Sequence, residues 1–235
     1  VKDFDFSGYM NPKDAKRLDL FCQYAIAASD EAMASANLPK DLRESEVDST
    51  RVGVIVSSGI GGLATMSDQD RVLLERGPGR ISPFLIPMMI GDIASGNISM
   101  RYGAGGPNLG LVTACATGTH SIGESYWMIK RDDADIMICG GTEATIVPLG
   151  VAGFCALKAL STRNDDPQHA SRPFDAGRDG FIMSEGAGVL ILEEYEHAKK
   201  RGVPILAEVV GYGATGDAHH RSEERRVGKE CRSRW

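Results

Sequence analysis

One cysteine lies in a sequence context suited to nucleophilic chemistry. The stretch Thr113-Ala114-Cys115-Ala116-Thr117-Gly118 directly follows the apolar residues 110–112, and a helix-like pattern extends over residues 117–130. This order predicts a strand, a tight turn of small residues and a helix, with the thiol at the junction. Unpaired N–H groups and the positive end of the helix dipole at such a junction favour a thiolate. Small neighbours leave room for a bulky acyl group, so the pattern resembles a nucleophile elbow with Cys in place of Ser. It indicates acyl transfer through a thioester.

The elements that would position this thiol alternate between helical and extended patterns. Apolar residues at a spacing of three to four predict helices over residues 13–35 and 87–102, and a polar, loop-like linker spans residues 164–171. Short apolar or β-branched runs predict strands at residues 51–57, 109–113, 136–139, 189–192 and 204–210. Such alternation predicts an α/β fold, a sheet covered by helices.

Composition restricts the class of protein. The chain has 235 residues, of which 42% are hydrophobic, and no stretch approaches the roughly 18 consecutive apolar residues of a membrane span. A secretory signal pattern is not visible at the start of the sequence. Five cysteines (Cys22, Cys115, Cys139, Cys155 and Cys231) form neither a CxxC pair nor a zinc pattern. We expect a cytoplasmic protein without a metal, and Cys139 is expected in a buried strand.

The charge is unevenly distributed along the chain. The whole sequence holds 26 basic and 32 acidic residues, and residues 221–235 contain six of the basic and three of the acidic ones. The first 220 residues therefore carry a net charge of −9, which argues against nucleic acid as a partner. Residues 221–235 lack any helical or strand period. They resemble a sequencing adapter read in frame, because AGA-TCG-GAA-GAG encodes the Arg-Ser-Glu-Glu found at residues 221–224. We interpret them as a non-native tail.

Several further motifs occur in the order in which a known enzyme family carries them. They are Ser58-Gly59-Ile60-Gly61-Gly62, Ile81-Ser82-Pro83-Phe84, Gly140-Gly141-Thr142-Glu143, Ala159-Leu160-Ser161-Thr162-Arg163-Asn164, Ser171-Arg172-Pro173-Phe174-Asp175, Arg178-Asp179-Gly180-Phe181, Glu185-Gly186-Ala187-Gly188 and Leu192-Glu193-Glu194-Tyr195-Glu196-His197-Ala198. With the Cys115 motif, they make the chain resemble the β-ketoacyl-[acyl-carrier-protein] synthases, and most closely the type II condensing enzymes of fatty-acid synthesis. The resemblance extends over residues 1–220.

The resemblance implies a thiolase-like layered α/β fold built from two similar halves. Residues 1–203 would form the N-terminal half without its first strand, which we expect in the centre of the first sheet. Residues 204–220 would begin the C-terminal half, and residues 221–235 would be the non-native tail.

The implied activity is a decarboxylative Claisen condensation of a Cys-bound acyl group with malonyl-[acyl-carrier protein], giving a 3-oxoacyl-[acyl-carrier protein] without a cofactor. Cys115 would be the nucleophile, and its own N–H one donor to the oxyanion. The family's two catalytic histidines, lysine and Gly-Phe loop lie in the second half and have no counterpart here. His120, His169 and His197 are not expected to replace them, and this chain alone is expected to be inactive.

The resemblance also implies binding residues. Ile60, Leu85 and Phe154 match positions that line the acyl pocket, although ordinary core packing would equally explain them, and relatives carry Phe where this chain has Leu85. An acidic acyl carrier protein would be the partner, and the matching basic residues are Lys13, Lys16, Arg17, Arg80 and Lys158. A solvated helix face is the alternative for each of these. A homodimer, paired through the strand before Cys115, is also implied.

Other interpretations remain open at this stage. A polyketide ketosynthase shares the cysteine motif, and a truncated gene product would be no enzyme at all. A thiolase is disfavoured by the motifs at residues 161–164 and 172–175. Asp175, Arg178, Asp179 and Glu185 resemble an acid–base group, but we interpret them as an ion-pair network.

Overall fold

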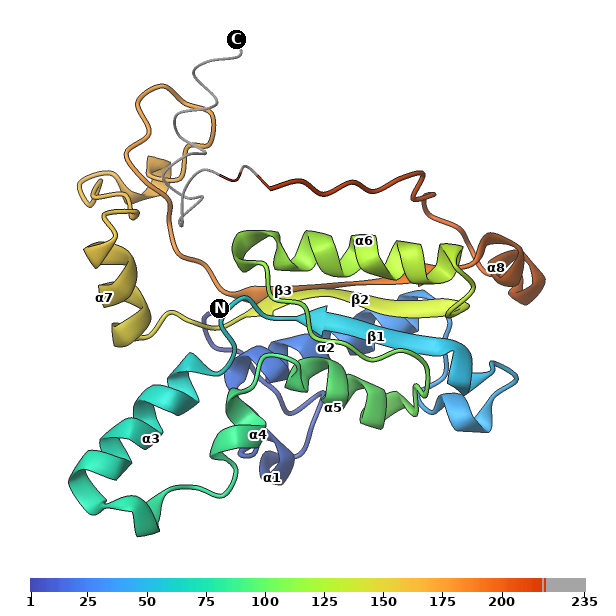
Figure 1. Ribbon diagram of the computed structural model, residues 1–235, viewed down its shortest axis with the longest axis horizontal. Coiled ribbons are helices and arrows are strands. Elements are labelled where there is room, and N and C mark those ends of the chain that lie inside the picture. Colours follow the sequence, from blue (N-terminus) through green and yellow to red (C-terminus); the bar gives the residue numbers. More distant parts are fainter. Residues whose placement is uncertain (217, 219–235) are drawn as a thin grey trace. The chain divides into compact units, whose positions relative to one another are not determined.

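The computed structural model describes residues 1–216 and 218 of the chain, which separate into two compact units. The first unit comprises Val1–Thr145 and Glu185–Gly213, and it contains the sheet and Cys115. The second comprises Ile146–Ser184 together with the described residues from Ala214 onward. Figure 1 labels the helices and strands of both.

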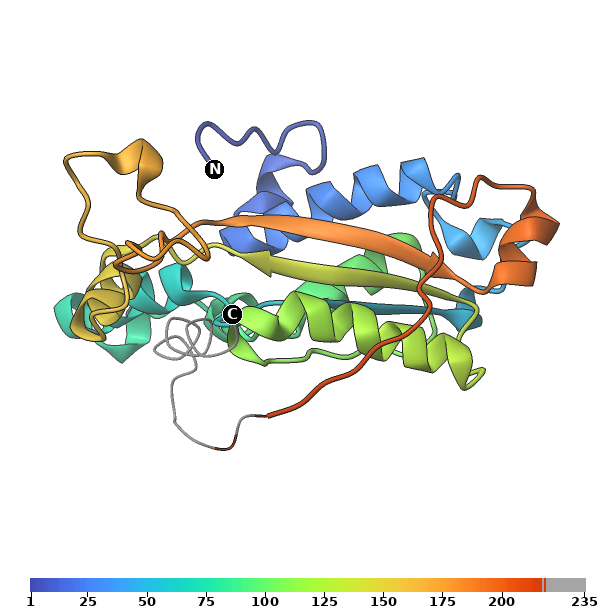
Figure 2. The same cartoon turned by 90° about the horizontal axis from the view of Figure 1, so that it is seen from above.

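The sheet of the first unit has three strands in the order β1 (Val52–Ser57), β2 (Ile136–Glu143) and β3 (Gly186–Glu193). Strands β1 and β2 are parallel, with Val52 opposite Ile136, whereas β3 runs antiparallel to β2. Figure 2 shows β2 between its two neighbours. All six residues of β1 are buried, as its β-branched sequence predicts.

The place expected for the absent first strand, at the centre of this sheet, is wrong, while its absence from residues 1–203 stays a prediction. Strands β1 and β2 pair directly over six consecutive residues, so the described sheet is continuous there.

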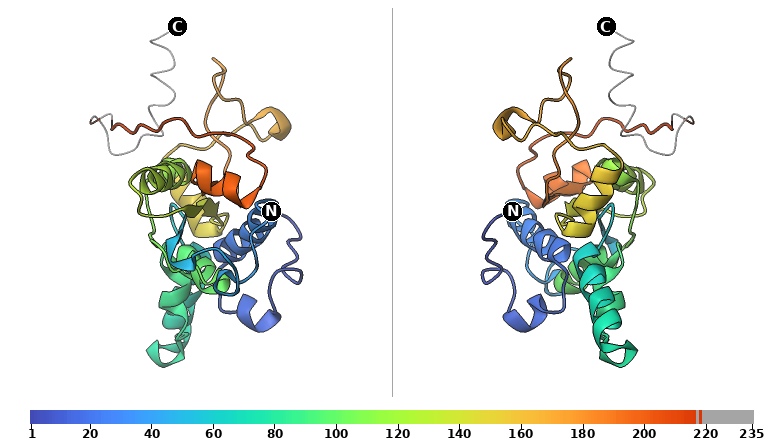
Figure 3. Two further views of the ribbon diagram at one scale, coloured as in Figure 1. Left: turned by 90° about the vertical axis from the view of Figure 1, so that its right-hand side faces the viewer. Right: turned by 90° about the vertical axis from the view of Figure 1, so that its left-hand side faces the viewer.

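Helices cover both faces of the sheet. Helices α2 (Leu20–Ser35) and α5 (Ile93–Tyr102) pack on one face and α6 (Thr117–Lys130) on the other, as Figures 1 and 3 show. Alternate side chains of a strand point to opposite faces, so Val54 joins the core beneath α2 and α5, while Ile55 joins Met128 on the α6 side. The predicted α/β arrangement is confirmed for this unit.

The predicted helix over residues 13–35 is in fact two helices, α1 (Pro12–Ala15) and α2. The Asn11 side chain accepts hydrogen bonds at the start of α1, and Asp19 lies at the N-cap of α2. The second carboxylate oxygen of Asp19 accepts from the N–H of Thr65 at 3.0 Å, in the first turn of another helix. The break therefore coincides with the N-cap at Asp19, a local polar signal that the apolar period does not register.

The region after the glycine-rich loop contains more helices than the sequence predicted. The expected helix over residues 87–102 is divided into α4 (Leu85–Met89) and α5. A further helix, α3 (Leu63–Arg76), was not predicted. Leu63 is the only buried residue of α3, whereas Met66, Leu73 and Leu74 of the same helix are exposed, so its apolar residues do not mark a side that faces the core.

Two predicted strands do not form. The segment before Cys115 makes a single bridge to β1, between Asn108 and Val54. The amide of Leu109 donates to the Val54 carbonyl at 3.2 Å, and after this bond residues 109–113 leave the edge of β1. Residues 204–210 pair with no described residue, and Leu206 is 88% exposed. A strand needs a neighbour to satisfy its backbone groups, and apolar composition cannot supply one.

The other described elements are short. In the first unit they are the 3₁₀ turns η1 (Leu42–Glu44), η2 (Ser49–Arg51), η3 (Pro78–Arg80) and η4 (Ala114–Ala116), and helix α8 (Tyr195–Arg201). The second unit contains α7 (Pro148–Ala156) and η5 (Pro167–His169), so the predicted linker at residues 164–171 is a loop with one such turn. Over residues 1–216 and 218, no helix has the length and apolar character needed to cross a bilayer.

Candidate active site

Cys115 lies in the 3₁₀ turn η4, directly before helix α6. The predicted turn and the helix from Thr117 to Lys130 are both confirmed. Cys115 is exposed and immediately precedes Ala116, the N-cap residue of this 14-residue helix. The unpaired N–H groups and the dipole at such a helix start stabilise a nearby anion, so the position favours a thiolate.

The turn itself is strained and is held by hydrogen bonds on either side of the thiol. Ala114 has a positive φ of 50°, a conformation that costs a non-glycine residue about 1–3 kcal/mol. Before it, the Thr113 amide donates to the Thr117 hydroxyl at 2.9 Å, and the Leu111 amide donates to the Ser57 hydroxyl at 3.0 Å. These bonds tie the turn to its own helix and to the end of β1.

The start of α6 approaches the end of β2 closely. A Cβ atom built on Gly141 would lie 3.0 Å from the Cα of Gly118, tighter than ordinary carbon–carbon contact. The missing side chain of Gly141 therefore lets the helix start directly over the strand, which places Cys115 at the carboxyl end of the sheet, where many α/β proteins bind ligands.

A carboxylate that the sequence analysis did not single out lies beneath this turn. Glu143, the last residue of β2, accepts a hydrogen bond from the Ser58 hydroxyl at 2.9 Å and another from the Gly59 amide at 3.0 Å. Burial raises the pKa of the Glu143 carboxyl, and these two hydrogen bonds act in the opposite direction. The available signal was an acid ending an otherwise apolar strand.

The histidines of the described chain have other partners. The ring of His120 meets that of Tyr212 edge-on, at 6.2 Å between centroids. His197 is bonded to Glu193 and His169 to Asp166. Within residues 1–216 and 218, no three His, Cys, Asp or Glu side chains are grouped so that they could hold a metal ion.

The residues expected to line an acyl pocket lie in both units. Ile60 is 45% exposed and Leu85 is half-buried at the start of α4. Their two segments are joined by a 3.0 Å hydrogen bond from the Gly62 amide to the Met89 carbonyl. Phe154 belongs to the second unit, where its ring meets Phe181 edge-on at 5.2 Å.

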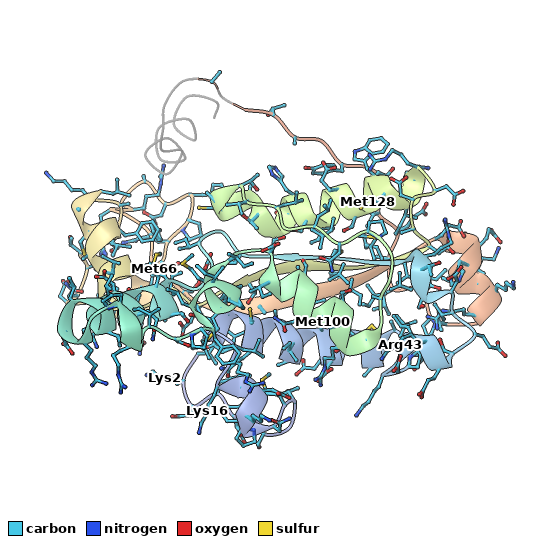
Figure 4. The ribbon with its side chains drawn as sticks, turned by 60° about the horizontal axis from the view of Figure 1, so that its bottom comes forward. Lys2, Lys16, Arg43, Met66, Met100 and Met128 are labelled. Carbon is cyan, nitrogen blue, oxygen red and sulfur yellow. The ribbon has the colours of Figure 1, made fainter. Side chains whose placement is uncertain are left out.

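The residues expected to bind a carrier protein are all exposed. Lys13, Lys16 and Arg17 surround the end of α1, and Figure 4 shows Lys16 projecting away from the sheet. The guanidinium of Arg17 lies 4.9 Å from the centre of the Phe84 ring, which orients it at this surface. Arg80 ends the turn η3 of the same unit, and Lys158 belongs to the second unit.

The charged residues predicted to form one ion-pair network have other partners: Glu185 pairs with the N-terminal amine of Val1 at 2.7 Å, and the network itself stays a prediction. In the second unit, Asp175 pairs with Arg172 at 3.2 Å, and the Ser161 hydroxyl donates to Asp179 at 2.7 Å. Glu185 belongs to the first unit, where it accepts from the hydroxyl of Tyr24.

Residues 2–198 match the family described as beta-ketoacyl synthase, N-terminal domain. Solved structures share the fold. A beta-ketoacyl synthase from Burkholderia phymatum STM815 has a TM-score of 0.82 and 30% identity, covering 98% of this chain and 58% of that one. A type II polyketide ketosynthase in complex with its acyl-carrier protein has a TM-score of 0.76 and 35% identity, covering 85% and 50%.

Curated relatives agree in sequence. A 3-oxoacyl-[acyl-carrier-protein] synthase 2 from Vibrio harveyi is 52% identical over 220 residues, which are 94% of this chain and 52% of the relative. Its namesake from Staphylococcus aureus is also 52% identical, over 94% of this chain and 53% of that protein. The chain spans about half the length of these relatives.

These likenesses define a thiolase-like α/β protein. The chain belongs to the beta-ketoacyl synthase family, so the resemblance that the sequence motifs indicated is confirmed.

Proposed function

We propose that the chain is part of a condensing enzyme that joins an acyl group, held as a thioester on Cys115, to malonyl-[acyl-carrier protein]. The product would be a 3-oxoacyl-[acyl-carrier protein], and CO₂ would be released. The exposed thiol in a strained turn directly before α6 carries this proposal. The names of the curated relatives support the reaction.

In the first step, the Cys115 thiolate attacks the carbonyl carbon of an acyl thioester. The Cys115 N–H would donate to the oxyanion that forms, and the thiol of the carrier would leave. The acyl chain would then lie against Ile60, Leu85 and Phe154. The second step needs the histidines and lysine that the family carries in its other half. In this chain alone, Cys115 would therefore become acylated, but the condensation with the malonyl group would not follow.

The partners follow from the same family. An acidic acyl carrier protein would approach the exposed basic residues Lys13, Lys16, Arg17, Arg80 and Lys158, which belong to both units. One of the solved relatives is a ketosynthase in complex with an acyl-carrier protein, which supports a carrier as the partner. We further propose a homodimer paired through the segment before Cys115, residues 109–113, a reaction without a cofactor, and a cytoplasmic location.

A polyketide ketosynthase is the second candidate. Two of the structural relatives are ketosynthases, one of them named as part of a type II polyketide system, at 31% and 35% identity. The curated relatives at 51–52% identity are 3-oxoacyl-[acyl-carrier-protein] synthases, which favours fatty-acid synthesis.

The test is to incubate the chain with malonyl-carrier protein and with a carrier protein that bears a saturated acyl group. Mass spectrometry then follows the acyl adduct on the chain and the 3-oxoacyl product on the carrier. We expect an acyl adduct on Cys115, absent from Cys115→Ala, and no 3-oxoacyl product. Acylation of the exposed Cys155 in place of Cys115 would refute the assignment of the nucleophile. Formation of the 3-oxoacyl product by this chain would refute its proposed incompleteness.

A further inference from the structure

The turn that carries Cys115 rests on a second turn at the end of β1. Residues 58–61 follow β1 directly, and the Ser58 hydroxyl accepts a hydrogen bond from the Gly61 amide at 2.7 Å. Ser58 is almost fully buried, at 1% exposure. The same hydroxyl donates to Glu143, so the 58–61 turn is fixed both internally and to the end of β2.

Gly59 lies between Glu143 and the Cys115 turn. A Cβ atom at Gly59 would lie 3.1 Å from the Oε2 atom of Glu143 and 3.2 Å from the carbonyl oxygen of Ala114. The carboxylate and that carbonyl therefore both lie against Gly59, at the place where a side chain would be. Ala114 is the residue with positive φ directly before Cys115, so its carbonyl is part of the strained peptide that the site must hold in place.

A carboxylate suits this position better than any other side chain. An ionised carboxylate has two oxygens that accept hydrogen bonds and no donor, and both oxygens of Glu143 are used, one by the Ser58 hydroxyl and one by the Gly59 amide. An amide in its place would present an N–H₂ group to one of these donors. Ser58 could not readily accept it, because its hydroxyl already accepts from the amides of Gly61 and Ile60.

We propose that Glu143 is a positioning residue for the nucleophile: it holds the 58–61 turn against the Ala114 carbonyl and thereby fixes the backbone that carries Cys115. This assignment rests on the proposed role of Cys115. The hydrogen bonds that carry this role run from Ser58 and Gly59 to Glu143. Its contribution is the orientation of the thiol toward the N-terminus of α6, on which the stabilisation of the thiolate depends.

The chain contains its own reference thiols for a test. Cys155 is exposed in the second unit and has no part in this network, whereas Cys22 and Cys139 are buried and report on folding. The rate of iodoacetamide alkylation is measured at each cysteine by peptide mass spectrometry from pH 6 to 10. The variant is Glu143→Gln, and Glu75→Gln, an exposed acid on α3, is the matched control for the loss of one charge.

In the unaltered chain we expect Cys115 to react faster than Cys155 near neutral pH. Glu143→Gln should lower that ratio about tenfold and raise the apparent pKa of Cys115 by about one unit, since one unit changes the thiolate fraction tenfold. Cys22 and Cys139 should stay protected, and Glu75→Gln should change nothing. An unchanged ratio in Glu143→Gln would overturn the positioning role. So would a fall in the apparent pKa, because Glu143 would then act through its charge.

Two further comparisons keep the test decisive. If Cys115 and Cys155 of the unaltered chain are alkylated at nearly the same rate, the proposed nucleophile itself is refuted. This outcome differs from a fast-reacting Cys115 whose rate does not change in Glu143→Gln. If Cys22 becomes reactive in Glu143→Gln, that variant has lost its fold and Ser58→Ala is measured in its place, because Ser58→Ala removes only the side-chain hydrogen bonds of the turn. We expect the same direction of change, and the double variant should lose less than the two single losses combined.

Discussion

The close contact between α6 and β2 can be perturbed from either side, and the two sides should respond differently. In Gly141→Ala the new Cβ would lie 3.0 Å from the Cα and 3.5 Å from the N of Gly118. Carbon atoms in contact prefer about 3.5–4.0 Å, so the helix start must move outward. In Gly118→Ala the new Cβ would lie 3.5 and 3.6 Å from atoms of Gly141, which is ordinary contact.

The expected magnitudes follow from these distances. Overpacking at a rigid backbone costs about 1–3 kcal/mol, so Gly141→Ala should lower the free energy of unfolding by that amount. At about 2–4 °C per kcal/mol for a protein of this size, Tm should fall by roughly 2–12 °C. Gly118→Ala should be neutral or should stabilise the chain by up to about 1 kcal/mol, because alanine favours a helix over glycine.

The assay is thermal and urea unfolding of both variants beside the unaltered chain, with the alkylation rate of Cys115 measured in parallel. Only Gly141→Ala should slow alkylation, because it moves the helix start away from the turn that carries the thiol. If Gly118→Ala destabilised the chain as much as Gly141→Ala, the steric argument would be refuted.

Three further outcomes are expected. Burial raises the pKa of Cys139 to about 12, so this thiol should remain unalkylated at pH 9 in the folded chain and react only in urea. Burial also raises the pKa of Glu143 above its ordinary value of 4.5. The folded chain then binds this proton more tightly than the unfolded chain, so the free energy of unfolding should fall as pH rises from 4.5 through the folded pKa. Urea midpoints from pH 4 to 7 should show this fall, and Glu143→Gln should abolish it. In a full-length enzyme, replacing Lys16 and Arg17 by Glu should raise the KM for a carrier-linked substrate by about tenfold and leave that for a CoA thioester nearly unchanged; equal changes in both would contradict docking at this surface.

The turn that holds Cys115 and the helix after it could be predicted because their signals are local, whereas the strand expected before them at residues 109–113 does not form. Small residues around the thiol and the apolar period after it predicted both the turn and the full extent of α6. The β-branched run at residues 51–57 predicted β1 with an error of one residue, because a strand buried on both faces needs a continuous apolar sequence. The burial of Cys139 was predicted for the same reason and is confirmed.

The errors have other causes. The break before α2 lies at Asp19, the N-cap of that helix, whose polar signal an apolar period does not register. Residues 204–210 have a strand-like composition but no neighbour with which to pair among the described residues. Helix α3 contains apolar residues such as Met66 and Leu73, but only Leu63 of this helix is buried. For these two segments the outcome depends on contacts between distant parts of the chain, or on their absence.

The sequence alone determined the family and the helix that follows Cys115, and it predicts Cys115 as the nucleophile, since these depend on residue types in a short, ordered stretch. Only the tertiary structure decided what supports that thiol. Glu143, Ser58 and Gly59 come from the ends of two different strands, and 84 residues of sequence separate Glu143 from Gly59. Parallel pairing of β1 and β2 brings those strand ends together, and no local pattern encodes which side chains then meet.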